Sequence, residues 1–156
     1  MTTTLLFVGK TTDPHIDTLC QEYLKRLTHY LPVRLQVIPE LRNTKALTPD
    51  QQKQAEGELI LRAVPQSADL ILLDEHGKEY RSVEFAQQLQ KKMSSGRDLF
   101  FAIGGLYGFS QAVYERANGK VSLSQMTFSH QMVRLFLIEQ IYRAMTILRG
   151  EPYHHE

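Results

Sequence analysis

The chain has 156 residues, 42% of them hydrophobic, and its 18 basic and 17 acidic side chains leave a formal net charge of +1. This length suffices for one well-buried core and is short for two, so we expect a single domain over residues 1–156. The near-zero charge excludes the broad basic surface of a nonspecific nucleic-acid binder, so any contact with RNA must be local. Short apolar runs and the lack of a signal-peptide pattern predict a cytoplasmic protein without membrane contact.

Four segments have the pattern of β-strands. Leu5–Val8, Leu70–Leu73 and Leu99–Ile103 are unbroken apolar runs, which indicate strands covered on both faces in a parallel sheet. Residues 33–37 instead alternate between apolar and polar and have a proline on each side, a pattern that favours an edge strand.

Helical patterns separate these strands. The first runs from about Pro14 to Tyr30 and places Cys20 on its apolar stripe, so we expect this single cysteine to be a packing residue. The second opens at Thr48 with a capping box and a proline in its first turn, and the third starts after Ser82. Because strand and helix alternate along the chain, we predict an α/β fold with a mostly parallel sheet and helices on both faces.

The stretch from Pro39 to Leu47, between the second strand and the second helix, resembles a linker. We expect a solvated loop there. Its cationic residues Arg42 and Lys45 leave contact with phosphate as the alternative.

Two of the central strands end in sequences that suit a ligand site, since ligands bind outside the carboxyl ends of strands in such sheets. Ile103 leads directly into Gly104-Gly105-Leu106-Tyr107-Gly108, where the backbone could approach a ligand or simply form a tight turn. Leu73 is followed by Asp74 and Glu75, which form either a carboxylate site or a polar turn. The motifs of phosphate loops, helical zinc sites and nucleophile elbows do not occur, and we expect no metal site.

The last helical pattern, Met132 to Leu148, is apolar at 12 of its 17 positions, so most of its circumference must be covered. Arg134 falls on the apolar side, and His130, one turn earlier, shares that face. With Ser129 as N-cap, His130 would lie in the first turn, where backbone N–H groups favour negative charge. The pair could act on an anionic group, or Arg134 could have a purely structural role.

Several of these segments together resemble the ribosomal RNA large subunit methyltransferase H family, small enzymes of the SPOUT class. The resemblance covers essentially the whole chain, with Ser129 where a proline is usual and a bulkier Leu106-Tyr107 in the glycine turn. It rests on Leu73-Asp74 with Gly77-Lys78, Ile103-Gly104-Gly105 with Gly108, Leu123 to Phe128 with His130 and Arg134, and Arg149 to His154.

The resemblance implies a SPOUT-type trefoil knot in the C-terminal part and an obligate homodimer. It further implies that S-adenosyl-L-methionine donates a methyl group to N3 of a pseudouridine in helix 69 of 23S rRNA, within the ribosome. The donor contacts that it implies are Leu73, Gly104, Leu123, Ser124, Gln125, Met126, Thr127 and Phe128.

On the same basis we expect Arg134 to stabilise the charge that develops on the base and His130 to orient or deprotonate it. The tail from Glu151 to Glu156 is expected to fold over the donor and substrate pocket, with Tyr153 as a packing or stacking contact and His154 as a polar one. His154 is the second catalytic candidate besides His130, in its own chain or at the partner's site. Two alternatives remain: a noncatalytic ribosome-binding domain of the same fold, and a metal-dependent phosphate hydrolase that uses Asp74 and Glu75.

Overall fold

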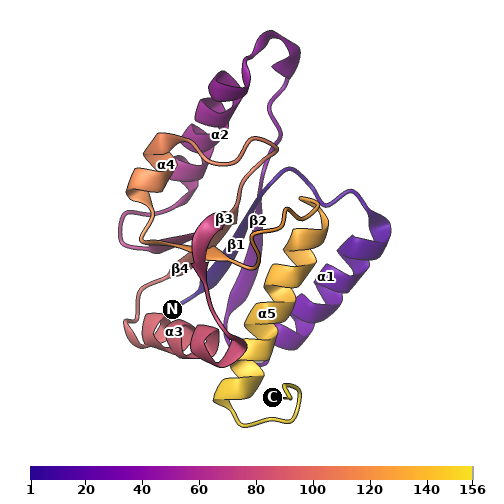
Figure 1. Ribbon diagram of the computed structural model, residues 1–156, viewed down its shortest axis with the longest axis vertical. Coiled ribbons are helices and arrows are strands. Elements are labelled where there is room, and N and C mark those ends of the chain that lie inside the picture. The colour runs from indigo at the N-terminus through magenta and orange to yellow at the C-terminus, as the bar shows by residue number, and fades with distance from the viewer. Residues whose placement is uncertain (156) are drawn as a thin grey trace.

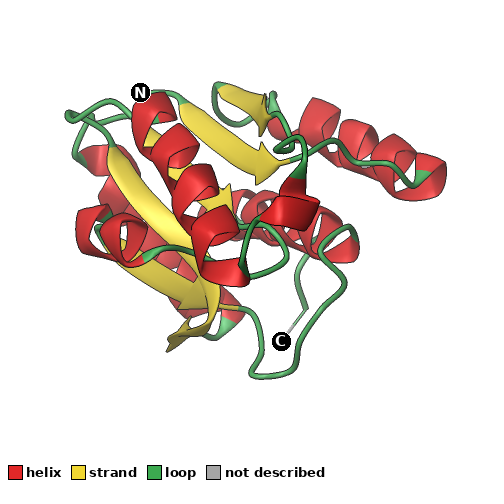
Figure 2. Cartoon of the chain, turned by 90° about the horizontal axis from the view of Figure 1, so that it is seen from above, coloured by secondary structure: helices red, strands yellow, loops and turns green. Residues whose placement is uncertain are grey.

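The computed structural model describes residues 1–155, and Glu156, the last residue of the expected domain, lies outside this range. Five parallel strands form one sheet, and helices cover both of its faces (Figures 1 and 2). The strands are β1 (Thr3–Val8), β2 (Val33–Ile38), β3 (Asp69–Glu79), β4 (Leu99–Ile103) and β5 (Gly119–Ser122). The helices are α1 (Pro14–Leu27), α2 (Pro49–Ala63), α3 (Ser82–Ser94), α4 (Gln111–Arg116) and α5 (Met132–Leu148), with a short 3-10 helix, η1 (Thr44–Ala46). The predicted α/β fold is confirmed.

The strand order β2-β1-β4-β3-β5 places the three unbroken apolar runs at the centre of the sheet. Ile103 at the end of β4 pairs with Phe7 near the end of β1 and with Leu73 of β3. β3 does not end there but continues to Glu79, with a register shift against β5 between Leu73 and Lys78. Asp74 and Glu75 therefore lie within this strand and not in a turn after it. The alternating segment forms the edge strand β2, as predicted. β5 was not predicted, because the four residues Gly119–Ser122 include a single large apolar side chain.

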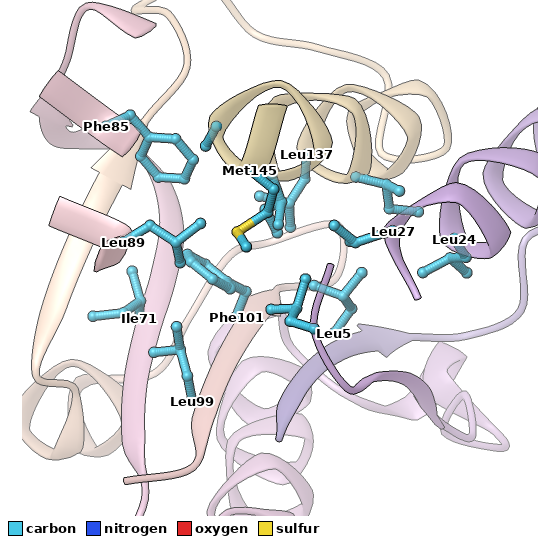
Figure 3. Close-up of a cluster of buried hydrophobic side chains, with 14 of the residues drawn as sticks. Leu5, Leu24, Leu27, Ile71, Phe85, Leu89, Leu99, Phe101, Leu137 and Met145 are labelled. Carbon is cyan, nitrogen blue, oxygen red and sulfur yellow. The ribbon is translucent and has the colours of Figure 1, made fainter. Parts of the chain in front are cut away.

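Two hydrophobic cores lie on opposite faces of the sheet. The larger core packs α1, α3 and α5 against one face, and the smaller core packs α2 and α4 against the other. Figure 3 shows the larger core, in which Leu137 and Met145 of α5 lie between Leu27 of α1 and Leu89 of α3, above Phe101 of β4. The short helix α4 escaped prediction because its six residues are too few to establish a helical period.

The apolar character of α5 follows from its position between two other helices. It contacts α1 along one side and α3 along the other, while a third side faces the sheet. Its interior positions Leu137, Ile138 and Ile141 are at most 1% exposed. Only Met132 and Phe136, in its first half, are large apolar residues that remain exposed on this helix. Most of the helix is therefore covered by its own chain.

The ends of the first two helices test the predicted caps. Thr48 and Gln51 form the reciprocal capping box of α2, with the Gln51 backbone N–H 3.1 Å from the Thr48 hydroxyl. α1 ends at Leu27, earlier than the predicted Tyr30.

Cys20 is 2% exposed, and burial, with a contribution from Asp17, raises the pKa of its thiol to about 11. The packing role predicted for this cysteine is confirmed.

Among residues 1–155, no helix combines the length and the apolar composition needed to cross a lipid bilayer.

Candidate functional site

A cavity of about 600 Å³ opens at the carboxyl end of β4 and at residues 73–76 within β3, beside the segment that follows β5. The chain therefore brings together the segments after Leu73, after Ile103 and after residue 122, which the sequence pattern had identified separately. The cavity is lined by residues 73–76, residues 103–109, Tyr114, Leu123, Ser124, residues 126–130 and Val133.

Seven of the eight residues predicted to contact a methyl donor line this cavity, namely Leu73, Gly104, Leu123, Ser124, Met126, Thr127 and Phe128. Gln125 is the exception, because it lines a separate surface hollow beside Gly77 and Glu79. His130 lies on the cavity wall and is exposed to solvent. The cavity wall also includes Ile103 and Val133, whose side chains add apolar surface.

The glycine turn after β4 is shaped by close packing on its inner side. A Cβ atom at Gly105 would lie 2.5 Å from a carboxylate oxygen of Glu56, and one at Gly104 would lie 3.2 Å from the ring of Phe109. The Gly108 N–H donates to the carbonyl of Gly105 at 3.1 Å, and Gly108 adopts a φ of +83°, which favours glycine. The segment is therefore both a tight turn and a wall where backbone can approach a ligand.

Carboxylates occupy the β3 side of the cavity. The Tyr114 hydroxyl donates to the carboxylate of Asp74, which also accepts the backbone N–H of His76 at 2.8 Å. Thr127 donates to Glu75 at 3.1 Å. Burial raises the pKa of the Tyr114 phenol, and the neighbouring Asp74 carboxylate raises it further, so this phenol stays a donor. Sequence reasoning missed Tyr114, because α4 showed no helical pattern.

The lining of the cavity contains no lysine or arginine, whereas Asp74 and Glu75 supply two carboxylates. Such a wall favours a cationic ligand over an anionic one. Within residues 1–155, no group of three histidine, cysteine or acidic side chains is arranged to hold a metal ion. The carboxylates therefore stand without the further ligands that a hydrolytic metal centre would need.

The buried carboxylate of Glu56 packs against the glycine turn. Glu56 of α2 is 6% exposed and accepts one hydrogen bond, from Gln52 at 3.3 Å. Burial raises the pKa of Glu56 above its usual value, and the charge of Glu40 raises it further. No sequence signal identified this residue, because Glu56 becomes buried only when α2 packs under the turn.

Arg134 does not line the cavity. It is 1% exposed, and its guanidinium donates to the carbonyls of Val8 at 2.8 Å and Gly9 at 2.9 Å and to the Thr11 hydroxyl at 3.0 Å. It also donates through Nε to the carbonyl of His130 at 3.1 Å. Arg134 therefore joins the end of β1 to the start of α5, which corrects the expectation that it faces a reacting base.

Neighbouring residues extend this junction, which we call the β1–α5 clamp and define as Arg134 and Gln131 with the backbone of residues 8–12. Gln131 accepts the backbone N–H of Thr12 at 2.7 Å and donates to the carbonyl of Lys10 at 3.3 Å. Ser129 accepts the N–H groups of Gln131 and Met132, but α5 begins only at Met132. His130 thus lies in the turn before the helix, and not in its first turn as expected.

The tail after α5 packs on the helices of its own chain. The Tyr153 ring meets Tyr142 edge-on at 4.8 Å, and its hydroxyl donates to Glu139 at 2.8 Å. His154 Nδ1 lies 3.1 Å from the Arg143 guanidinium. Because α5 runs away from the carboxyl edge of the sheet, it carries the tail to the opposite end of the molecule (Figure 1). The expectation that the tail covers the cavity of its own chain is therefore wrong.

Comparison with known proteins gives a consistent result over the whole chain. The family model described as "Predicted SPOUT methyltransferase" matches residues 1–154. A protein of Bacteroides fragilis named ribosomal RNA large subunit methyltransferase H is 57% identical over 157 residues, which cover 100% of each chain. A protein of the same name from Bacteroides thetaiotaomicron is 56% identical over 100% of each chain, and one from Flavobacterium johnsoniae is 56% identical over 97% of this chain and 98% of its own.

The β1–α5 clamp generates a prediction about stability. Replacing Arg134 by alanine should lower the free energy of unfolding by about 3 kcal/mol, because it leaves buried carbonyls at the end of β1 without donors. Arg62→Ala on the exposed side of α2 is the matched control. It should change the free energy of unfolding by less than about 0.5 kcal/mol. Urea unfolding of the three proteins measures this, and a loss below about 1 kcal/mol for Arg134→Ala would contradict the clamp.

Glu56 generates a prediction about pH. Its pKa in the folded protein lies above the usual value of 4.5, so the folded state binds this proton more tightly than the unfolded state. The folded protein should therefore lose stability as the pH rises from 4.5 through the raised pKa, and Glu56→Gln should remove this part of the pH dependence. Glu58→Gln, on the exposed side of the same helix, should leave the pH profile of the unfolding free energy unchanged. Identical profiles for wild type and Glu56→Gln would refute the assignment.

Proposed function

Because the chain belongs to the SPOUT methyltransferase family, and within it to the proteins named ribosomal RNA large subunit methyltransferase H, we propose that it methylates 23S rRNA at N3 of a pseudouridine in helix 69. The observation that carries this proposal is the cavity at the carboxyl edge, whose wall holds seven of the eight residues expected around the methyl donor. The substrate is proposed to be this helix within the ribosome.

The residues of the cavity fit S-adenosyl-L-methionine as the donor. Gly104 lines the cavity without a side chain, and apolar side chains such as Leu73 and Phe128 can hold a flat heteroaromatic ring. Asp74 and Glu75 suit a ligand that carries a positive charge. When bound, S-adenosyl-L-methionine would supply a methyl group on a cationic sulfur. The protein's part is to hold the donor and to orient the base beside it.

His130 is the residue that we propose to act on the base. N3 of a uridine-type ring carries a proton at neutral pH, so this proton must leave before or during methylation. The His130 side chain lies on the cavity wall, and its imidazole can accept this proton or hold the ring by a hydrogen bond. Its backbone is held by Arg134, which we propose as a positioning residue and not as a group that touches the base.

We propose a homodimer that uses the exposed apolar residues at the start of α5. Phe128 and Phe136 meet edge-on at 5.4 Å and are each 36% exposed, with Met132 at 47% on the same helix. Burial of these side chains against a second copy would remove apolar surface from water. Since His154 lies away from the cavity of its own chain, any role in catalysis would be exerted at the partner's cavity. The trefoil knot stays a prediction of the family resemblance.

The alternatives gain no support from specific contacts. Asp74 is engaged by Tyr114 and by the backbone of His76, which leaves a metal-dependent hydrolase without a ligand cluster among residues 1–155. A noncatalytic ribosome-binding domain would keep the same fold, and only a transfer assay separates it from an enzyme.

The transfer assay uses tritiated S-adenosyl-L-methionine and ribosomes from a strain that lacks this activity. Wild-type protein should label 23S rRNA, and His130→Ala should lower kcat roughly 100-fold with an unchanged affinity for the donor. Gly104→Val should abolish donor binding in calorimetry, because the added side chain meets Phe109 and fills the cavity wall. Donor binding without labelling of rRNA would favour the noncatalytic alternative, and a lack of donor binding by the wild type would defeat the proposal.

The dimer is tested by sedimentation at micromolar concentration. Phe136→Glu should shift the protein toward monomer, because it buries a charge at the proposed interface. Val37→Glu is the control, since Val37 on edge strand β2 is 38% exposed and is not part of the proposed interface. Ile138 cannot serve in this test, because it is 0% exposed and a charge there would disrupt the core. A monomeric wild type would refute the dimer.

A further inference from the structure

The tip of the glycine turn presents two large side chains to solvent at the mouth of the cavity. Leu106 is 73% exposed and Tyr107 is 44% exposed, and both line the opening. Gly105 and Gly108 pair with each other on either side of them, so the tip is a tight two-residue connection. Met126, which is 77% exposed, lines the same opening from the segment after β5.

These side chains lie outside both hydrophobic cores. Neither Leu106 nor Tyr107 belongs to either hydrophobic core, whereas the neighbouring Phe109 is 4% exposed and lies in the smaller core. The turn is held by its glycines and by the packing of Gly105 on Glu56. A large aromatic ring that lies outside the core and is exposed beside a ligand cavity is available to contact a substrate.

Basic residues occur in the segments that follow β1 and β2. The Lys10 backbone is bonded to Gln131, the residue after His130, so Lys10 adjoins the cavity wall. The loop that follows β2 starts beside the same place, because the Glu40 side chain packs against the Cα of Gly9. Further along, this loop exposes Arg42 and Lys45 and projects at the top of the molecule (Figure 1).

Charge is thus distributed unequally on this part of the molecule. The β3 side of the opening carries Asp74 and Glu75, whereas the segments after β1 and β2 carry Lys10, Arg42 and Lys45, with Glu40 as the one acidic residue in the loop after β2. A polyanion is repelled by the first side and attracted by the second. An exposed aromatic ring together with cations on the same surface is the combination that proteins use to hold unpaired nucleotides.

We propose that the Leu106–Tyr107 tip and the cations Lys10, Arg42 and Lys45 form the surface that binds rRNA, with the Tyr107 ring stacked on an unpaired nucleobase at the mouth of the cavity. The RNA backbone then crosses the carboxyl edge over β1 and β2, where the three cations contact its phosphates. This inference rests on the proposed function, and it adds the direction of approach and the residues that recognise the RNA.

The test measures methyl transfer to ribosomes from a strain that lacks this activity. Tyr107→Ala should raise KM for ribosomes about tenfold, in the range expected for loss of one stacked base, while Tyr107→Phe keeps the ring and should behave as wild type. Donor affinity, measured by calorimetry, should be unchanged in both variants. A fall in donor affinity would assign Tyr107 to the donor and overturn the proposal, as would an unchanged KM for Tyr107→Ala.

The cations are tested by the triple variant Lys10→Ala, Arg42→Ala, Lys45→Ala. It should raise KM for ribosomes and lower the slope of log KM against log salt by about 2, since each lost phosphate contact removes roughly 0.7 of that slope. Lys91→Ala, an exposed lysine on α3, is the control and should change neither. An unchanged salt slope in the triple variant overturns the assignment of these cations.

Sedimentation of Tyr107→Ala separates the RNA surface from a contact between two copies. An unchanged dimer supports the RNA assignment, and a weakened dimer would show that a second copy covers the tip and would overturn it. If wild-type protein fails to label ribosomes, the proposed function fails. If wild type labels them and the variants retain its KM, only the present inference fails.

Discussion

The junction between the end of β1 and the start of α5, beside the cavity, depends on one buried arginine. The Arg134 guanidinium donates to two carbonyls at the end of β1, to Thr11 and to the carbonyl of His130, and it stacks 5.0 Å from the ring of Phe7. It thereby fixes the last helix, α5, to the end of β1. The position of His130 on the cavity wall therefore depends on this junction.

This junction works without a carboxylate in direct contact with the guanidinium. Burial lowers the pKa of Arg134, whereas the more distant charge of Glu40 acts in the opposite direction. Backbone carbonyls replace the water that the cation loses, and the planar fork of an arginine suits several of them at once. A lysine offers one point of charge and could not join the end of β1 to the start of α5 in the same way.

The sequence predicted the elements that are long or strongly patterned and missed those that are short. The buried central strands are unbroken apolar runs, a pattern that predicts a buried strand from the local sequence alone. β5 and α4 are too short to show a period. Periodicity identified Arg134 as an unusual residue on an apolar face, but it could not say what covers that face. The contacts of Tyr114 with Asp74 and of Gly105 with Glu56 join residues about 40 to 50 positions apart, which no local pattern reveals. The tail was expected to be ordered by contacts with the rest of the protein, and it is. The direction of α5, which the sequence does not reveal, places these contacts away from the cavity.

The glycine turn also divides the site into a part that must be conserved and a part that is free to change. Gly105 is held against Glu56 by steric contact, so substitution there disturbs the wall on which a donor would rest. Leu106 and Tyr107 are exposed on the same turn and lie outside both hydrophobic cores. With the RNA contact that we propose for this pair, target preference could diverge within a lineage by exchange of two neighbouring residues. The same separation makes this pair a natural position for a randomised library that seeks new RNA targets while the methyl-donor chemistry is inherited unchanged.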